Sequence, residues 1–353
     1  MRIVKLTLLC VGMLLVAGCN TIGPTTIPRD RFDYSGALAE SWKSQMLLNL
    51  VKMRYLDLPI YLEVGQIVSG YTVETTGTAG GDIGNPLGGT NFFGLEAQRK
   101  FTDRPTITYT PLTGNRFLES FLTPIAPVKL LALMQSGFDA DFVLELGVES
   151  LNGLRNRPVS IGAKHKADAD FFRVLALLRD IQDARAMGVR VEHPRKDRTD
   201  TIVFFRRDRT HASILAKIEK VRKLLRLAPG RFEFRLVESP LWGGGDTLAI
   251  STRSLLQVMT ALSLGVEVPP EDLRRGLTPA MPENVPGDVP LLRVRSSTAP
   301  PESAFVAVSY ERKWFWVAND DWQSKRTFSS ILFLFTLADV NAKGLPVLTI
   351  PAQ

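Results

Sequence analysis

The chain has 353 residues, of which 45% are hydrophobic, 22% charged and 8% aromatic. This composition excludes a disordered or collagen-like protein, and the length suffices for one large domain or two of ordinary size. The two cysteines, Cys10 and Cys19, both fall near the N-terminus, which excludes a disulfide framework and a cysteine-based zinc site.

Residues 1–18 have the pattern of a secretory signal peptide. Arg2 and Lys5 precede an uncharged apolar run, residues 6–18, which is too short to span a bilayer core of roughly 30 Å. The run ends in Val16-Ala17-Gly18-Cys19, which resembles the lipobox of bacterial lipoproteins. That resemblance implies cleavage before Cys19 and acylation of its thiol. The alternative is an ordinary signal peptide that happens to hold a cysteine.

The lipobox resemblance also carries an expectation about location. In such lipoproteins an Asp after the cysteine retains the protein in the inner membrane, and the Asn20 found here favours the outer membrane. Acyl chains, palmitate among them, would then hold the protein on that membrane facing the periplasm. Each buried methylene contributes about 0.8 kcal/mol, so several chains make the anchor effectively permanent. Residues 19–34 are expected to be the lipidated N-terminus and an extended tether.

Positive charge is concentrated in one stretch. From Arg190 to Arg235 there are fourteen Lys or Arg and six Asp or Glu, a local net of +8, against +7 for the whole chain. This favours an anionic envelope surface as partner, such as phospholipid headgroups, lipopolysaccharide or peptidoglycan, or else reflects solvated faces of a strand pair and a helix. Nucleic acid is not expected as the partner of an exported protein. The best contact candidates lie on the outward side of a helix predicted over 211–227: Lys217, Lys220 and Lys223.

The first half of the chain predicts these elements in order. A helix over 36–54 precedes one or two strands over 60–75, and a mobile loop over 76–94 follows because seven glycines stand in nineteen positions. Strands over 95–111 come next. Helices are expected near 114–122, 127–136, 139–153 and 167–187, and a hairpin joins 189–193 to 201–206.

The second half continues after the basic helix. Strands are predicted over 231–238 and 246–251, a helix over 252–264, and a proline-rich surface connection over 276–290. Strands over 291–296, 303–310 and 313–318 precede a largely buried helix near 325–340, and a last strand is expected over 346–350. The buried residues of that helix are predicted to be Phe328, Ile331, Leu332, Phe333 and Phe335.

This order of elements predicts the fold class. Helices and strands occur in clusters and not in strict βαβ units, which favours an α+β fold with short, mostly antiparallel strands. We expect an N-terminal region over 35–187 and a C-terminal region over 188–353.

The sequence shows little that resembles an active site. His165, His193 and His211 stand far apart and form no pair with metal-ligand spacing, and there is no Gly-x-Ser-x-Gly motif. Asp168 and Asp170 are interpreted as helix-start residues because carboxylates there favour the helix dipole. We therefore predict no catalytic residues, metal site or cofactor, and favour a non-enzymatic protein.

A weak internal pattern places an arginine at the start of three predicted helices, at Arg116, Arg253 and Arg326. A cation there opposes the helix dipole by about 0.3–1 kcal/mol, which an anion bound at the free backbone amides would offset. These arginines are candidate anion contacts. The alternative is that each pairs with a carboxylate of its own fold.

Three segments together resemble a known family. They are the lipobox, RFDYSGALAESWKSQMLLNLVKMRYLDLPIYLEV (residues 31–64), and the closing AFVAVSYERKWFWV (304–317) with SKRTFSSILFLFTLAD (324–339). The chain looks like a family of Gram-negative bacterial lipoproteins of unknown function, and the resemblance implies envelope localisation and no catalytic residues. The function expected first is a non-enzymatic binding or assembly component with an envelope protein partner. The alternatives are a periplasmic hydrolase of an envelope polymer, or an oligomeric export component that uses the 76–94 loop.

Overall fold

The computed structural model describes residues 27–68, 70–82, 92–112, 119, 121–159, 166–195, 198–208, 210–239, 243–280 and 290–338. These residues form eight helices and thirteen strands. They belong to two units, one with residues up to Trp42 and Leu62–Thr110, the other with Lys43–Tyr61 and the chain from Pro111 onward. The signal peptide, Cys19, Arg116 and the strand expected over 346–350 lie outside the described residues.

The described chain begins in helix α2, Ile27–Arg54. The predicted helix over 36–54 is confirmed and ends where expected, but the extended tether predicted through residue 34 is wrong from Ile27 onward. Pro28 falls in the first turn, where its missing N–H costs no hydrogen bond, and Asp30 there favours the helix dipole. Met46, Leu47, Leu50 and Val51 are buried and anchor the second half of the helix in the core.

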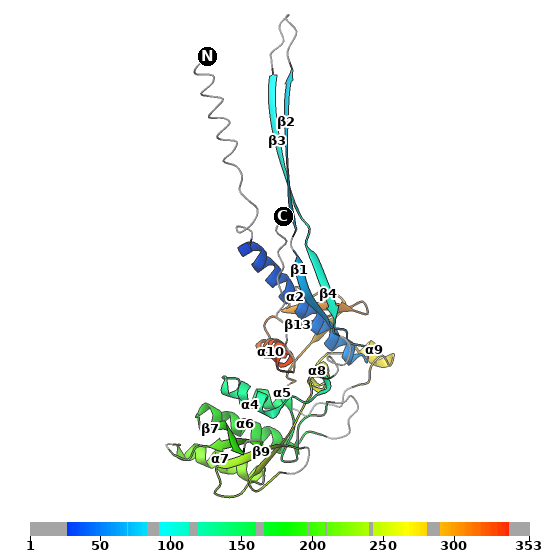
Figure 1. Ribbon diagram of the computed structural model, residues 1–353. Coiled ribbons are helices and arrows are strands. Elements are labelled where there is room, and N and C mark those ends of the chain that lie inside the picture. The colour runs from blue at the N-terminus through cyan, green and yellow to red at the C-terminus, as the bar shows by residue number, and fades with distance from the viewer. Residues whose placement is uncertain are drawn as a thin grey trace, which may run out of the picture. The chain divides into compact units, whose positions relative to one another are not determined.

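Four strands of the first unit form a two-stranded ribbon. Strand β1 (Leu62–Val68) pairs with β4 (Thr106–Pro111), and β2 (Tyr71–Asp82) pairs with β3 (Phe92–Asp103), as Figure 1 shows. The register of β2 and β3 is unbroken from Tyr71 opposite Asp103 to Asp82 opposite Phe92. At about 3.3 Å per residue, β2 and β3 are each about 40 Å long.

The ribbon corrects the predicted glycine-rich loop. Residues 76–82 and 92–94 are strand, and residues 83–91 lie outside the described part. A β-ladder needs only main-chain N–H and C=O groups, so the pairing of Gly77 with Ala97 and Gly80 with Gly94 continues it. Glycine weakens such a strand without forbidding it.

The second unit contains a six-stranded sheet in the order β6-β5-β10-β9-β8-β7. Every neighbouring pair is antiparallel except β9 with β10. The strands are β5 (Val148–Leu151), β6 (Leu154–Arg155), β7 (Met187–Arg195), β8 (Arg198–Phe205), β9 (Glu233–Glu238) and β10 (Thr247–Thr252). The predicted hairpin β7–β8 is confirmed.

Four helices accompany this sheet as successive packed neighbours in Figure 1: α4 (Pro127–Gln135), α5 (Ala140–Gly147), α6 (Ala169–Asp183) and α7 (Ala212–Leu224). The core face of α6 is Phe171, Val174, Leu175, Leu178 and Ile181, as its helical spacing predicted. Asp168 and Asp170 lie at the start of α6, where the sequence placed them. Helix α5 is shorter than predicted, because it ends at Gly147 and strand β5 begins at Val148.

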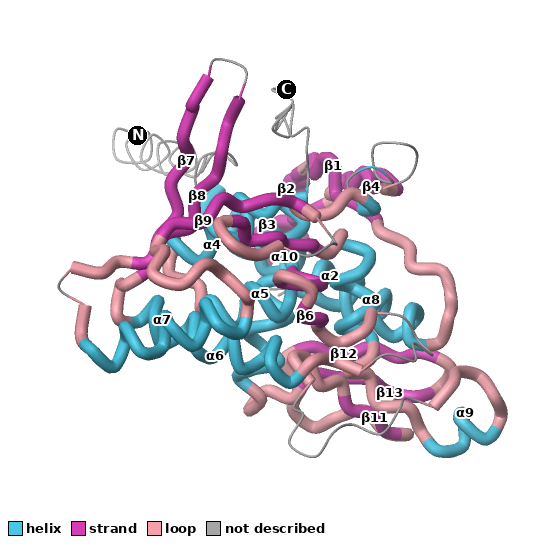
Figure 2. The backbone as a smooth tube through the Cα atoms, turned by 90° about the horizontal axis from the view of Figure 1, so that it is seen from below, coloured by secondary structure: helices cyan, strands magenta, loops and turns pink. Residues whose placement is uncertain are grey.

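The remaining elements of this unit form a three-stranded antiparallel sheet, β11-β13-β12, with three helices. Figure 2 shows β11 (Arg295–Ser297), β12 (Val306–Tyr310) and β13 (Lys313–Val317) side by side near helix α9 (Pro270–Arg274). The other helices are α8 (Leu255–Ser263) and α10 (Trp322–Ala338). Ser254 and Gln257 form a reciprocal capping box that fixes the start of α8.

Helix α10 corrects the predicted core. Phe328 and Ile331 are fully buried, but Leu332 is 46% and Phe333 49% exposed, and Phe335 is half-buried. Leu334, which the prediction omitted, is buried. The apolar run is longer than the buried face of one helix, so part of it faces outward. With mixed helices and mostly antiparallel strands, the described chain has the α+β class predicted.

Candidate functional site

The polar side of strands β2 and β3 is a long exposed feature of the first unit. Because side chains alternate along a strand, Thr72, Glu74 and Thr76 share one side of β2, and their respective partners on β3 are Thr102, Lys100 and Gln98. All are exposed except the half-buried Thr102. Glu74 and Lys100 are direct cross-strand partners, with 3.9 Å between Lys100 Nζ and Glu74 Oε2.

The main chain of the ribbon offers a second feature. Within the described residues, β2 pairs only with β3 and β1 only with β4, so each of these strands has an outer edge without a partner strand. Such an edge presents a row of N–H and C=O groups that readily add a further strand. An isolated two-stranded sheet is marginal in water and gains from such an addition. The ribbon is therefore a candidate protein-protein interface.

The three predicted lysines lie on α7, but they are not equivalent. Lys217 is half-buried, and its Nζ lies 2.6 Å from Asp180 Oδ2 on the neighbouring helix α6. Lys220 and Lys223 are exposed and form no ion pair with a described residue. Ile218 and Val221 hold the opposite side of the helix in the core, as predicted.

Much of the basic stretch around these lysines is neutralised within the fold. Arg190 makes a bidentate pair with Glu233, at 2.9 and 2.7 Å, and hydrogen bonds from Arg190 lower the pKa of that carboxyl. Arg222 pairs with Glu219 and donates to the carbonyl of Arg231. His211 caps the start of α7 by accepting from the Ser213 amide. The local net charge therefore overstates the charge available to a partner.

Arg253 is buried, with an exposed fraction of 2%. Its guanidinium donates to the carbonyls of Glu145 and Leu146, at the end of helix α5, and of Arg157. Burial lowers the pKa of Arg253 to about 10. A cation at the carbonyl end of a helix favours its dipole, so this contact explains the residue without a bound anion.

Arg326 has a carboxylate partner within the fold. Asp139 lies 2.7 Å from Arg326 and 2.6 Å from Arg179, and it thereby joins the start of α10 to α6. The Arg326 guanidinium also lies over the rings of Phe142 and Trp322. The structure does not bring Arg253 and Arg326 together around one site.

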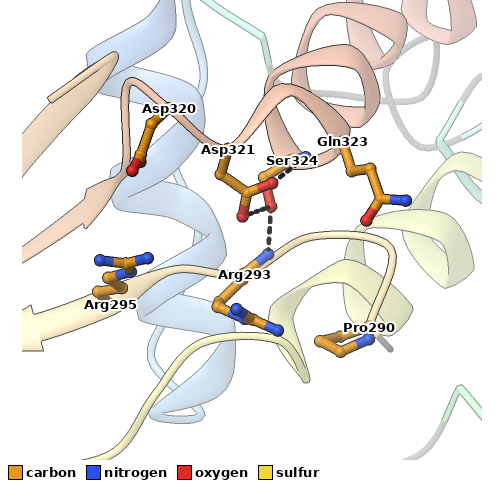
Figure 3. A pocket seen from close by; sticks show the side chains of 7 residues that line it. All are labelled: Pro290, Arg293, Arg295, Asp320, Asp321, Gln323 and Ser324. Atoms are coloured by element: carbon orange, nitrogen blue, oxygen red, sulfur yellow. Dashed lines mark hydrogen bonds between the residues drawn. The ribbon is translucent and has the colours of Figure 1, made fainter. Parts of the chain in front are cut away.

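A polar pocket of about 220 Å³ lies at the start of α10 (Figure 3), lined by Pro290, Arg293, Arg295, Asp320, Asp321, Gln323 and Ser324. Asp321 caps the helix by accepting from the amide and hydroxyl of Ser324, at 3.0 and 2.8 Å. The Ser324 hydroxyl in turn accepts from the Arg293 amide at 2.9 Å. These contacts account for Ser324 and Asp321 as capping groups, and no histidine lines the described pocket to activate the serine.

Comparison of the chain with known proteins identifies no relative. No family model, curated protein or solved structure matches the chain. Over the described ranges, no helix has the length and apolar character needed to cross a membrane. The same residues contain no group of three or more His, Cys, Asp or Glu arranged to hold a metal ion.

Proposed function

We propose that the protein is a lipid-anchored, non-enzymatic assembly component of the cell envelope, and that the ribbon is its interaction element. Acylated Cys19 would hold it on the outer membrane, facing the periplasm. The observation that carries the assembly role is the ribbon with its unpartnered outer edges. The lipobox at residues 16–19 supports the anchor.

The hydrolase alternative has less support. A hydrolase needs two carboxylates or a base and a nucleophile that meet around one substrate atom. The neighbouring acids of the described pocket are Asp320 and Asp321, and Asp321 is engaged in helix capping. A strand edge, in contrast, binds through its main chain and asks for no convergent acid and base.

Removing strands β2 and β3, called ribbon removal below, tests the proposal. Gly70 and Arg104 are joined by a main-chain hydrogen bond of 2.9 Å, so a short Gly-Ser turn can replace residues 71–103 there. We expect this variant to stay membrane-bound and folded, but to lose the envelope proteins that co-purify with the intact chain.

The matched control is Cys19→Ser, which removes the anchor and keeps the ribbon. It should leave the protein unprocessed or soluble while the ribbon stays able to bind its partner. Unchanged co-purification after ribbon removal would refute the assembly role. Wild-type protein in the soluble periplasmic fraction would refute the anchor.

A further inference from the structure

We infer that the partner of the ribbon is a second copy of this chain, with β2 of one copy paired edge to edge with β3 of the next. This inference rests on the proposed function, because it names the partner of the same interaction element. Repeated from copy to copy, the contact is head-to-tail: the two surfaces that meet are different, and each copy supplies one of each.

Strand direction selects β3 as the strand that meets β2. Within one copy the two strands are antiparallel. If copies are anchored to one membrane in the same orientation, their ribbons point the same way, and only β2 against β3 of the neighbour gives an antiparallel pair. Antiparallel pairing is slightly more stable per residue than parallel pairing. A β2 to β2 contact between ribbons with a common direction would be parallel.

The exposed charges fit this pairing. Glu74 on β2 and Lys100 on β3 are exposed and form a direct cross-strand pair, with the acid on one strand and the base on the other. A neighbour whose Lys100 lies beside Glu74 extends the cross-strand pair that each ribbon already contains. Directly opposite like charges are unfavourable in a sheet, so a β2 to β2 contact that brings two Glu74 side chains together is disfavoured.

The side chains of β2 are also compatible with pairing to a further strand. The threonines at 72, 76 and 78 are β-branched and suit an extended chain that gains a new neighbour.

Charge reversal in mixed populations tests the contact. Glu74→Lys places lysine against Lys100 of an identical neighbour, and Lys100→Glu places glutamate against Glu74. We expect each variant alone to show reduced co-capture of differently tagged full-length copies from detergent-solubilised membranes, by up to about fivefold at each contact. When both variants are expressed together, every head-to-tail contact between unlike variants joins a lysine and a glutamate, so co-capture of one variant by the other should rise toward the wild-type level.

Mixing separates this effect from damage to the ribbon itself. Each single variant also breaks the pair within its own ribbon, and no second copy can repair that break. Recovery on mixing therefore requires contact between copies. The double variant E74K/K100E should associate with itself but poorly with wild type.

The outcomes also separate this inference from the proposed function. Loss of co-purified envelope proteins on ribbon removal, without self-capture by the wild type, would retain the assembly role and overturn self-pairing. Self-capture that mixing fails to restore would also overturn the β2 to β3 contact. A cross-link between two membrane-anchored copies that carry Thr76→Cys alone, in which acylation leaves Cys19 without a free thiol, would indicate β2 to β2 pairing and overturn it as well.

Discussion

The hydroxyl of Tyr55, just past the end of helix α2, donates to the carboxylate of Asp272 on helix α9 at 2.6 Å. The ammonium of Lys313, the first residue of β13, binds the other oxygen of the same carboxylate. Asp272 is completely buried, and the Lys313 side chain is 15% exposed. Three elements far apart in the sequence are therefore tied to one buried charge.

Breaking this buried pair should destabilise the protein strongly. Asp272→Asn leaves the Lys313 ammonium without its charged partner, and removing one partner of a buried ion pair costs about 3–5 kcal/mol. The free energy of unfolding from urea denaturation of the Cys19→Ser form measures the loss. The double variant Asp272→Asn/Lys313→Met should recover part of it, because neither charge remains buried. A cost below about 1 kcal/mol for Asp272→Asn would contradict the contribution assigned to the pair.

The same carboxylate should make stability fall in acid. Burial alone would raise the pKa of Asp272, but the hydrogen bonds from Lys313 and Tyr55 outweigh it and lower the pKa below the ordinary value of 3.8. A lowered pKa in the folded state gives stability that is present above about pH 4 and is lost as the pH falls through the folded-state pKa. The difference in unfolding free energy between wild type and Asp272→Asn should therefore shrink below about pH 4. A constant difference down to pH 2 would argue against this linkage.

Tyr55 should make the free energy of unfolding fall at alkaline pH. Burial first, and then the hydrogen bond to Asp272, raise the pKa of this hydroxyl well above its ordinary value of 10. A raised pKa gives stability that is complete below about pH 10 and is lost as the pH rises further. Tyr55→Phe should lower stability at neutral pH and flatten the decline above pH 10. An identical alkaline decline in both proteins would assign it to another group.

We expect Arg253, which precedes helix α8, to stabilise the protein through its hydrogen bonds to the end of helix α5. Removing its guanidinium takes this donor from the main-chain carbonyls of Leu146 and Arg157, at about 1–3 kcal/mol for a buried unsatisfied group, while the Glu145 carbonyl keeps a hydrogen bond from Asn156. Arg253→Met tests this by urea denaturation, because it keeps much of the side-chain volume. Arg253→Lys is the matched control, which keeps the charge and loses the planar fork. If anion binding were instead the role of Arg253, added phosphate would stabilise the wild type but not Arg253→Met.

Local patterns predicted the elements whose signals are local. Phe171, Val174, Leu178 and Ile181 repeat at helical spacing, and the structure buries this face of α6. The β7–β8 hairpin is likewise formed by neighbouring segments of sequence. Both elements can be recognised from the sequence because the spacing of their apolar residues and the turn between neighbouring strands are local features.

The ribbon shows why other elements were missed. The density of glycines predicted a loop, although the β-branched residues Thr72, Thr75, Thr76 and Thr78 favour a strand. Strand β2 is stabilised by its pairing with β3, and the residues of one strand alone do not reveal that partner. The tether was misjudged in a similar way, because Pro28 both disfavours a helix interior and suits a first helical turn.

The candidate sites were harder still to foresee. Arg253 reads as a helix-start arginine, but the carbonyl of Glu145 that it binds lies 108 residues away in sequence. The partners of Lys217 and Arg326, Asp180 and Asp139, are also distant in sequence. Pairing between segments depends on tertiary packing, which one sequence does not reveal.

Helix α10 should show two classes of apolar residue. Phe328 is fully buried, so Phe328→Ala should cost about 3–5 kcal/mol through lost transfer energy and a cavity. Leu332→Ala on the same helix should change the free energy of unfolding by less than about 1 kcal/mol, because that side chain is 46% exposed. Urea denaturation of both variants checks the contrast. Equal costs would show that Leu332 is covered in solution.

The lysines of α7 should differ in what they contribute, with Lys217 stabilising the fold and Lys220 and Lys223 available to a partner. Lys217 is paired with Asp180, whereas Lys220 and Lys223 are exposed. If α7 meets an anionic surface, Lys220→Gln/Lys223→Gln should weaken binding of the soluble Cys19→Ser form to anionic phospholipid vesicles, while stability changes by no more than about 0.5 kcal/mol. Binding of the wild type should also fall as salt rises, since exposed charges are screened over roughly 8 Å at physiological ionic strength. Lys217→Gln is the control and should reduce stability by up to about 1 kcal/mol with a smaller effect on binding. Equal vesicle retention of wild type and the double variant at low salt would leave these lysines as a solvated helix face.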